Sequence, residues 1–182
     1  MGNVISMNNI DLSAVYNRTS IGSRGARGDA DGSGYSFDGA TLPRTVTYNG
    51  VDFRLAHGKG GPDTMSCQGQ TLKLKKPLLK GESVYVLCVA VNGCQAVSVT
   101  SHHLGGAFTQ CGLLVDDWCR PFESNIAFEA PHRLNPDGEI EETGAYLYVC
   151  ELDTRERRVN ALTFGVSPNF NVLALSIAES SE

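Results

Sequence analysis

The chain has 182 residues, of which 41% are hydrophobic and 19% charged, and its formal net charge is −5. This length and hydrophobic content predict one globular domain over residues 1–182, with a buried core. The negative charge argues against a nucleic-acid partner, because nonspecific affinity for phosphates needs clustered Lys and Arg. No run of 18 apolar residues occurs, and residues 1–17 lack the basic and apolar regions of a signal peptide, so we expect no membrane partner.

The chain contains six cysteines, and none of them forms a C-x-x-C pair or has zinc-finger spacing. Without a secretion signal, we expect reduced thiols and a cytoplasmic location. If the chain is a domain of a larger secreted protein, it would lack its own signal as well, so this second location stays open.

Eight segments rich in Val, Leu, Tyr, Phe and Thr are predicted strands: 44–56, 70–74, 83–91, 94–100, 107–115, 145–152, 158–166 and 171–178. Asn49-Gly50 divides the first of them into a hairpin. No segment keeps the apolar spacing of a helix over more than a couple of turns, so we expect little helix. Because crossover helices are missing, the pattern predicts an all-β fold, an antiparallel β-sandwich or jelly roll.

Two of these strands have informative patterns. Residues 83–91 are apolar on both faces, as is typical of a strand in the middle of a sandwich. Residues 171–178 alternate, which predicts Leu173 and Leu175 on one face and Val172 and Ala174 on the other. We therefore expect this last strand to lie within a sheet.

The stretch "DADGSGYSFDGATLP", residues 29–43, resembles the first half of an EF-hand loop, with Asp29 and Asp31 at its first and third positions. The twelfth position is Ala40 instead of glutamate, which excludes a true EF-hand. Two interpretations remain: a calcium site of another kind at Asp29 and Asp31, or an Asx-turn that holds no ion. We expect no other cofactor. Phe37 is predicted in the core and Asp38 as the cap of a turn.

The segment "VDDWCRPF", residues 115–122, contains the only tryptophan, Trp118. This residue either stacks on a sugar ring or anchors the core. Asp117 and Arg120 beside it can bond sugar hydroxyls, and His103 is a fourth candidate ligand residue. His102 and His103, with nearby acids, leave open a small metal-dependent hydrolase or lyase, but adjacent residues of a strand point to opposite faces.

Six segments together resemble a known family, the galactose-binding-like β-sandwich domains attached to bacterial and fungal glycoside hydrolases. The motifs are Asp11-Leu12, Phe37-Asp38-Gly39, Leu42-Pro43, Gly50-Val51-Asp52-Phe53, Gly69-Gln70 and Asp117-Trp118. The resemblance covers most of the chain in the family's order and implies a noncatalytic accessory role, with sugar binding and packing against a catalytic domain.

These observations predict a noncatalytic module that binds a carbohydrate or glycoconjugate through Trp118, Asp117, Arg120 and His103, without catalysis of its own. Two alternatives remain: a structural or accessory subunit that docks on a partner glycoside hydrolase, and the small metal-dependent enzyme. The docking alternative predicts an exposed apolar surface.

Overall fold

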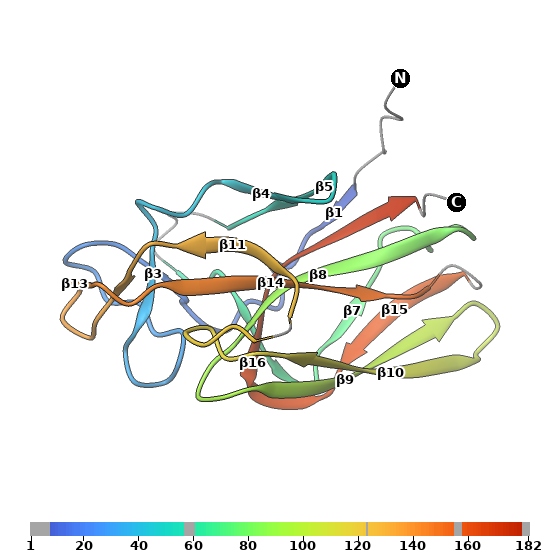
Figure 1. Ribbon diagram of the computed structural model, residues 1–182. Helices are drawn as coiled ribbons and strands as arrows, with labels where there is room; N and C mark the ends of the chain where they lie inside the picture. Colours follow the sequence, from blue (N-terminus) through green and yellow to red (C-terminus); the bar gives the residue numbers. More distant parts are fainter. Residues whose placement is uncertain (1–7, 57–60, 123, 155–157, 180–182) are drawn as a thin grey trace, which may run out of the picture.

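The computed structural model of the chain describes residues 8–56, 61–122, 124–154 and 158–179 (Figure 1). These residues form strands joined by turns and bends, and no helix occurs among them. The all-β prediction is confirmed. The named strand pairs are antiparallel except for β2 and β3, which run parallel.

Four groups of strands make up the fold. The central sheet has the order β1-β16-β8-β14-β11, and β6 also pairs with β16: β1 (Asn8–Ile10), β16 (Val166–Glu179), β8 (Glu82–Ala90), β14 (Ala145–Leu152), β11 (Ile126–Ala130) and β6 (Met65–Gln68). The outer sheet has the order β10-β9-β15-β7: β10 (Phe108–Val115), β9 (Gln95–His103), β15 (Val159–Phe164) and β7 (Thr71–Lys73).

Two smaller groups complete the fold on the other side of the central sheet. The small sheet has the order β13-β12-β3-β2: β13 (Ile140–Glu141), β12 (Arg133–Leu134), β3 (Ser36–Asp38) and β2 (Ile21–Gly22). A hairpin of β4 (Thr45–Tyr48) and β5 (Val51–Arg54) stands apart from it. In Figure 1 this hairpin lies at the top, β8 and β14 of the central sheet in the middle, and β9 and β10 at the bottom.

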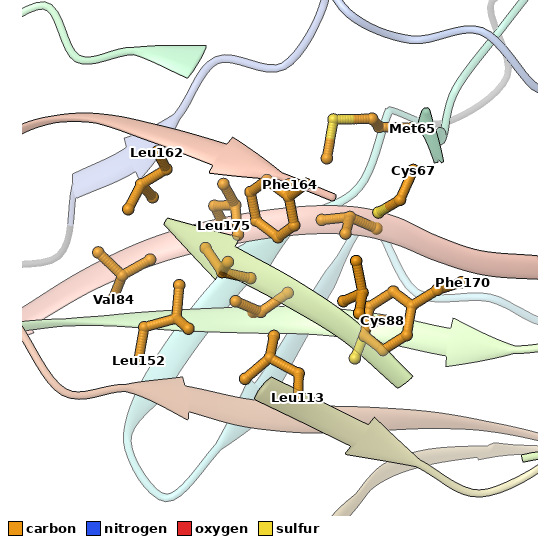
Figure 2. Packing of buried hydrophobic residues seen from close by; sticks show 14 of the residues in the cluster. Met65, Cys67, Val84, Cys88, Leu113, Leu152, Leu162, Phe164, Phe170 and Leu175 are labelled. Carbon is orange, nitrogen blue, oxygen red and sulfur yellow. The ribbon is translucent and has the colours of Figure 1, made fainter. Parts of the chain in front are cut away.

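Each face of the central sheet is covered by its own hydrophobic cluster. The first cluster fills the space toward the outer sheet, where Leu162 and Phe164 of β15 meet Phe170 and Leu175 of β16 (Figure 2). The second cluster lies on the opposite face and includes Phe37, which is fully buried as predicted, with residues of β4 and β5. A fully buried Leu or Phe stabilises a fold by about 1.5–3 kcal/mol, so both interfaces contribute to holding the layers together.

Strand β8 occupies the centre of the molecule, as its double-sided apolar pattern predicts. Val86 and Cys88 belong to the first cluster, whereas Leu87 and Val89 belong to the second. The strand lies between β16 and β14 and is therefore covered on both faces and paired along both edges.

The alternation predicted for residues 171–178 is wrong at one point. A β-bulge shifts the register of β16 against β8 between Val172 and Ala174, so that Leu173 is an extra residue. Leu173 and Ala174 therefore both face the second cluster, and Val172 and Leu175 both face the first. The prediction that this strand lies within a sheet is confirmed, because β16 pairs with β1 and β8.

Positive backbone φ angles occur at both residues of two Asn-Gly turns. Asn49 and Gly50 have φ values of 47° and 81° and join β4 to β5, as the Asn-Gly pair predicts. Asn92 and Gly93, with φ values of 59° and 100°, lead the chain from β8 of the central sheet to β9 of the outer sheet. Both turns need a left-handed conformation that Asn and Gly tolerate best.

Candidate functional site

A pocket of about 680 Å³ opens where β8 ends and where β9 and β14 begin, and we call it the loop pocket. Its walls come from four separate parts of the chain: the loop before β3, the turn after β8, the segment after β10, and residues of or next to β12 and β13. The lining residues are Asp31, Ser33, Tyr35, Asn92, Gly93, Cys94, Asp117, Trp118, Cys119, Arg120, Arg133 and Thr143.

The first wall is the loop of residues 29–35, whose shape is fixed by its two aspartates. Asp29 Oδ1 accepts hydrogen bonds from the amides of Gly32 (2.6 Å) and Gly34 (3.0 Å). Asp31 Oδ1 accepts from the amides of Ser33 (2.8 Å) and Tyr35 (3.2 Å). These are the Asx-type contacts of the ion-free interpretation.

The calcium site at Asp29 and Asp31 stays a prediction. Asp29 does not line the loop pocket, whereas Asp31 does. Among the residues that the structure describes, no group of three or more His, Cys, Asp and Glu side chains is arranged to hold a metal ion.

The turn after β8 and the segment after β10 are held together by Asp117. Its Oδ2 accepts the Gly93 amide at 2.6 Å, and its Oδ1 accepts the Cys119 amide at 2.9 Å. Asn92 then joins this turn to the first wall, because its side-chain amide donates to the Asp31 carbonyl at 2.8 Å. Asp117 and Asn92 therefore fix the shape of the pocket.

Trp118 is 3% exposed, so the core interpretation describes its position. Its ring meets the ring of Phe37 edge to face, with the centroids 5.2 Å apart. The Arg133 guanidinium lies 5.5 Å from the Trp118 centroid and 4.3 Å from the Tyr35 centroid. A ring buried in this way has no open face for stacking a sugar, and Tyr35, which is partly exposed, supplies the aromatic surface of the pocket.

Arg133 is fixed on several sides. Its Nη2 donates to Glu141 Oε1 at 2.5 Å, and its Nη1 donates to Cys119 Sγ at 3.0 Å. Burial raises the pKa of the Cys119 thiol to about 11, although the positive charge of Arg133 acts in the opposite direction. Cys119 is therefore a neutral thiol near pH 7, and a nucleophilic role is not what this environment provides.

Several polar groups of the pocket remain available to a ligand. The side chains of Arg120, Ser33 and Thr143 make no hydrogen bond to other described residues. Asp31 Oδ2 accepts no hydrogen bond from a described residue either. The lining of the pocket thus includes a cation, a carboxylate oxygen and two hydroxyl groups.

The structure brings three of the four predicted ligand residues to one pocket and leaves the fourth elsewhere. Asp117, Trp118 and Arg120 line the pocket, but His103 is at the far end of β9, roughly 26 Å along the strand from Gln95. The His103 ring bonds the Thr109 hydroxyl at 3.0 Å and is buried.

His102 and His103 do not share a site. His102 bonds the Thr163 hydroxyl at 2.8 Å and is half-buried on the other face of the outer sheet. The opposite orientation that strand geometry predicts for this pair is therefore observed.

Sequence reasoning missed Tyr35, Asn92, Cys119 and Arg133 as pocket residues. The sequence did indicate a turn at Asn92, because an Asn-Gly pair between two apolar strands marks a tight turn. No local pattern in the sequence indicated Arg133. It belongs to a two-residue strand, and only the tertiary fold places it beside Trp118.

The fold defines the class of protein as a β-sandwich domain, and its loops enclose a pocket with a partly polar lining. The model of the AziU2-like beta-sandwich domain family matches residues 6–181, and the chain belongs to this family. No match was found among curated proteins. The match supports the β-sandwich part of the resemblance and gives no support to its galactose-binding or glycoside-hydrolase part. In the described ranges, no helix is long and apolar enough to span a membrane.

Proposed function

We propose that this chain is a noncatalytic binding module and that the loop pocket holds a carbohydrate, free or as part of a glycoconjugate. The observation that carries this proposal is that Arg120, Asp31 and the hydroxyls of Ser33 and Thr143 line one pocket. A sugar hydroxyl both donates and accepts hydrogen bonds, so it needs donors and acceptors side by side.

The size of the pocket agrees with a small polar ligand. Its volume of about 680 Å³ is within the range of about 300–1,000 Å³ typical of small-molecule sites. The walls are tied together by hydrogen bonds through Asp117 and Asn92, so the site is formed before the ligand arrives. A preformed site loses less free energy to ordering on binding.

Arg120 is the best residue for a test, because removing its side chain breaks no hydrogen bond within the described structure. We expect isothermal titration with a panel of mono- and oligosaccharides to give saturable binding to at least one member. Arg120→Ala should then weaken that binding about tenfold or more, since a hydrogen bond to a charged group contributes about 1.5–3 kcal/mol.

Arg27→Ala is the matched control. Arg27 is also an exposed arginine, but its ion-pair partner is Asp137 at 3.9 Å and it does not line the pocket. Its loss should leave the affinity unchanged. No heat with any sugar at concentrations of about 1 mM, the weak end of specific binding, would refute the carbohydrate proposal.

The docking alternative is favoured by a different observation, the apolar side chains exposed on the outer sheet. Phe108 and Leu114 of β10 are 67% and 71% exposed. A partner glycoside hydrolase stays a prediction for this surface. Pull-down with a candidate hydrolase, compared between the unaltered chain and Leu114→Glu, tests it, and equal capture by both would contradict docking through β10.

A further inference from the structure

Strand β10 forms one edge of the outer sheet. All eight of its residues pair with β9, from Phe108 opposite His102 to Val115 opposite Gln95, without a bulge. Its other side pairs with no strand among the described residues. Among the described residues this edge of the sheet is therefore long, regular and unpaired.

This edge lacks the features by which sheet edges usually avoid pairing with other chains. Such protection comes from charged side chains, prolines, bulges or very short strands. Residues 105–115 contain no charged residue and no proline, in a chain with 35 charged residues in all: 15 Lys and Arg plus 20 Asp and Glu. An extended strand that adds to this edge therefore meets no charged side chain and no proline of β10 itself.

The hydrogen-bonding pattern shows which backbone groups face outward. The His103 amide donates to the Ala107 carbonyl, and in an antiparallel pair the bonded positions recur at every second residue. The odd-numbered residues of β10 thus bond β9. The N–H and C=O groups of Phe108, Gln110, Gly112 and Leu114 point away from β9 toward the open edge.

We infer that β10 pairs with β10 of a second copy of this chain, antiparallel and about a twofold axis at Cys111. Phe108 and Leu114 stand three residues before and three residues after Cys111. The axis therefore places each Phe108 opposite Leu114 of the other copy, on the same exposed face. It also places Gln110 opposite Gly112, so that each outward N–H and C=O finds a partner.

Because the edge is complementary to itself, a second copy of this chain fits it better than an unrelated strand does. In this one register, the exposed Phe108 of each copy is covered by Leu114 of the other copy, and each exposed Leu114 is covered by Phe108. The contact is confined to a sheet edge and is small beside the roughly 1,200–2,000 Å² of stable complexes. The dimer is accordingly weak. It shares no residue with the loop pocket, so its presence or absence is independent of the proposed carbohydrate binding. It uses the same side chains of β10 as the docking alternative, so the two contacts exclude each other.

A charge-swap experiment tests the register. Sedimentation equilibrium should show mass rising toward a dimer between about 1 µM and about 1 mM, the range of weak association. Phe108→Lys and Leu114→Glu should each shift the chain toward monomer. The double variant, Phe108→Lys with Leu114→Glu, should restore the dimer, because each lysine then faces a glutamate of the other copy. Phe108→Glu with Leu114→Glu should stay monomeric.

Val166→Glu is the matched control, because Val166 is 76% exposed but belongs to β16. It should leave association unchanged, and circular dichroism should show all variants folded. Mild oxidation should also link two copies through Cys111, with the linkage lost in Cys111→Ser and kept in Cys94→Ser. A concentration-independent monomer, or a dimer that Leu114→Glu leaves intact, overturns the inference.

Discussion

His132 Nε2 lies 3.0 Å from Asp38 Oδ2, and this contact joins the residue before β12 to the last residue of β3. The Asp38 side chain is 1% exposed, and its Oδ1 accepts the Ala40 amide at 2.9 Å. The predicted turn cap is therefore confirmed. The Asp38 side chain also makes a buried contact with His132 that joins two strands of the small sheet.

The pKa of Asp38 makes this contact sensitive to acid. Burial acts to raise the pKa, but hydrogen bonds from His132 and the Ala40 amide, with the charges of His132 and Arg24, outweigh it and lower the pKa below its usual 3.8. A carboxyl with a lowered folded pKa stabilises the fold above its unfolded pKa. That contribution is lost as the pH falls through the folded value.

We expect His132→Ala to lower the free energy of unfolding at pH 7 by about 1.5–3 kcal/mol, the usual contribution of a hydrogen bond to a charged group. The gap from the unaltered chain should narrow as the pH falls below 3.8, the ordinary pKa that applies to the unfolded chain, toward the lower pKa of folded Asp38. Urea unfolding at several pH values measures it. His102→Ala is the control, since His102 bonds a hydroxyl. A gap that stays constant down to pH 3 would contradict the role of Asp38 ionisation.

Replacing Arg133 by lysine should destabilise the chain by about 1–3 kcal/mol, because an ammonium cannot match the planar stacking and forked hydrogen bonds of a guanidinium. Arg133 contacts Tyr35, Glu141 and Cys119 at once. The exposed Arg27→Lys should change stability by less than about 0.5 kcal/mol. Equal effects of the two substitutions in urea unfolding would show that the Arg133 contacts contribute little.

The fluorescence of Trp118, the only tryptophan, should report a buried indole. Its emission should lie at short wavelength, acrylamide should quench it weakly, and unfolding should shift it to longer wavelength as water reaches the ring. Because Trp118 lines the loop pocket, a bound sugar should also change its intensity. Strong quenching of the native chain would place the ring at the surface instead.

The thiols should differ sharply in reactivity. Cys94 and Cys111 are exposed, so a maleimide at low protein concentration should label them first. Cys67 and Cys88 are fully buried, and burial raises the pKa of Cys67 to about 12 and that of Cys88 well above its usual value. They should react only after unfolding. Peptide mapping by mass spectrometry identifies the labelled sites, and early labelling of Cys88 would contradict this core.

The long strands, such as β8, could be predicted from the sequence because they contain more apolar residues than a turn or a surface strand does. The short strands β2, β3, β12 and β13 could not, because two or three residues are too few to show a period. The bulge at Leu173 was also invisible, since an extra residue inside an apolar run leaves the composition unchanged. For the same reason the face of each β16 residue had to come from the structure.

The lining of the candidate site was predictable only where its residues are neighbours in sequence. Asp117, Trp118 and Arg120 lie within four positions, so their common pocket follows from their spacing. Arg133 and Tyr35 join them through pairing of distant strands, which no local pattern encodes. His103 was grouped with them by residue type alone, and the length of β9 separates it from the pocket.

Strands β8, β14 and β16 each contribute side chains to both hydrophobic clusters, as Val86 and Leu87 do on β8 and Tyr148 and Leu147 on β14. Neither cluster can therefore come apart while the other keeps its strands in place. We expect cooperative unfolding in one calorimetric transition, with equal calorimetric and van't Hoff enthalpies. A cavity made by Phe53→Ala in one cluster should lower the melting temperature reported by Cys88 labelling in the other.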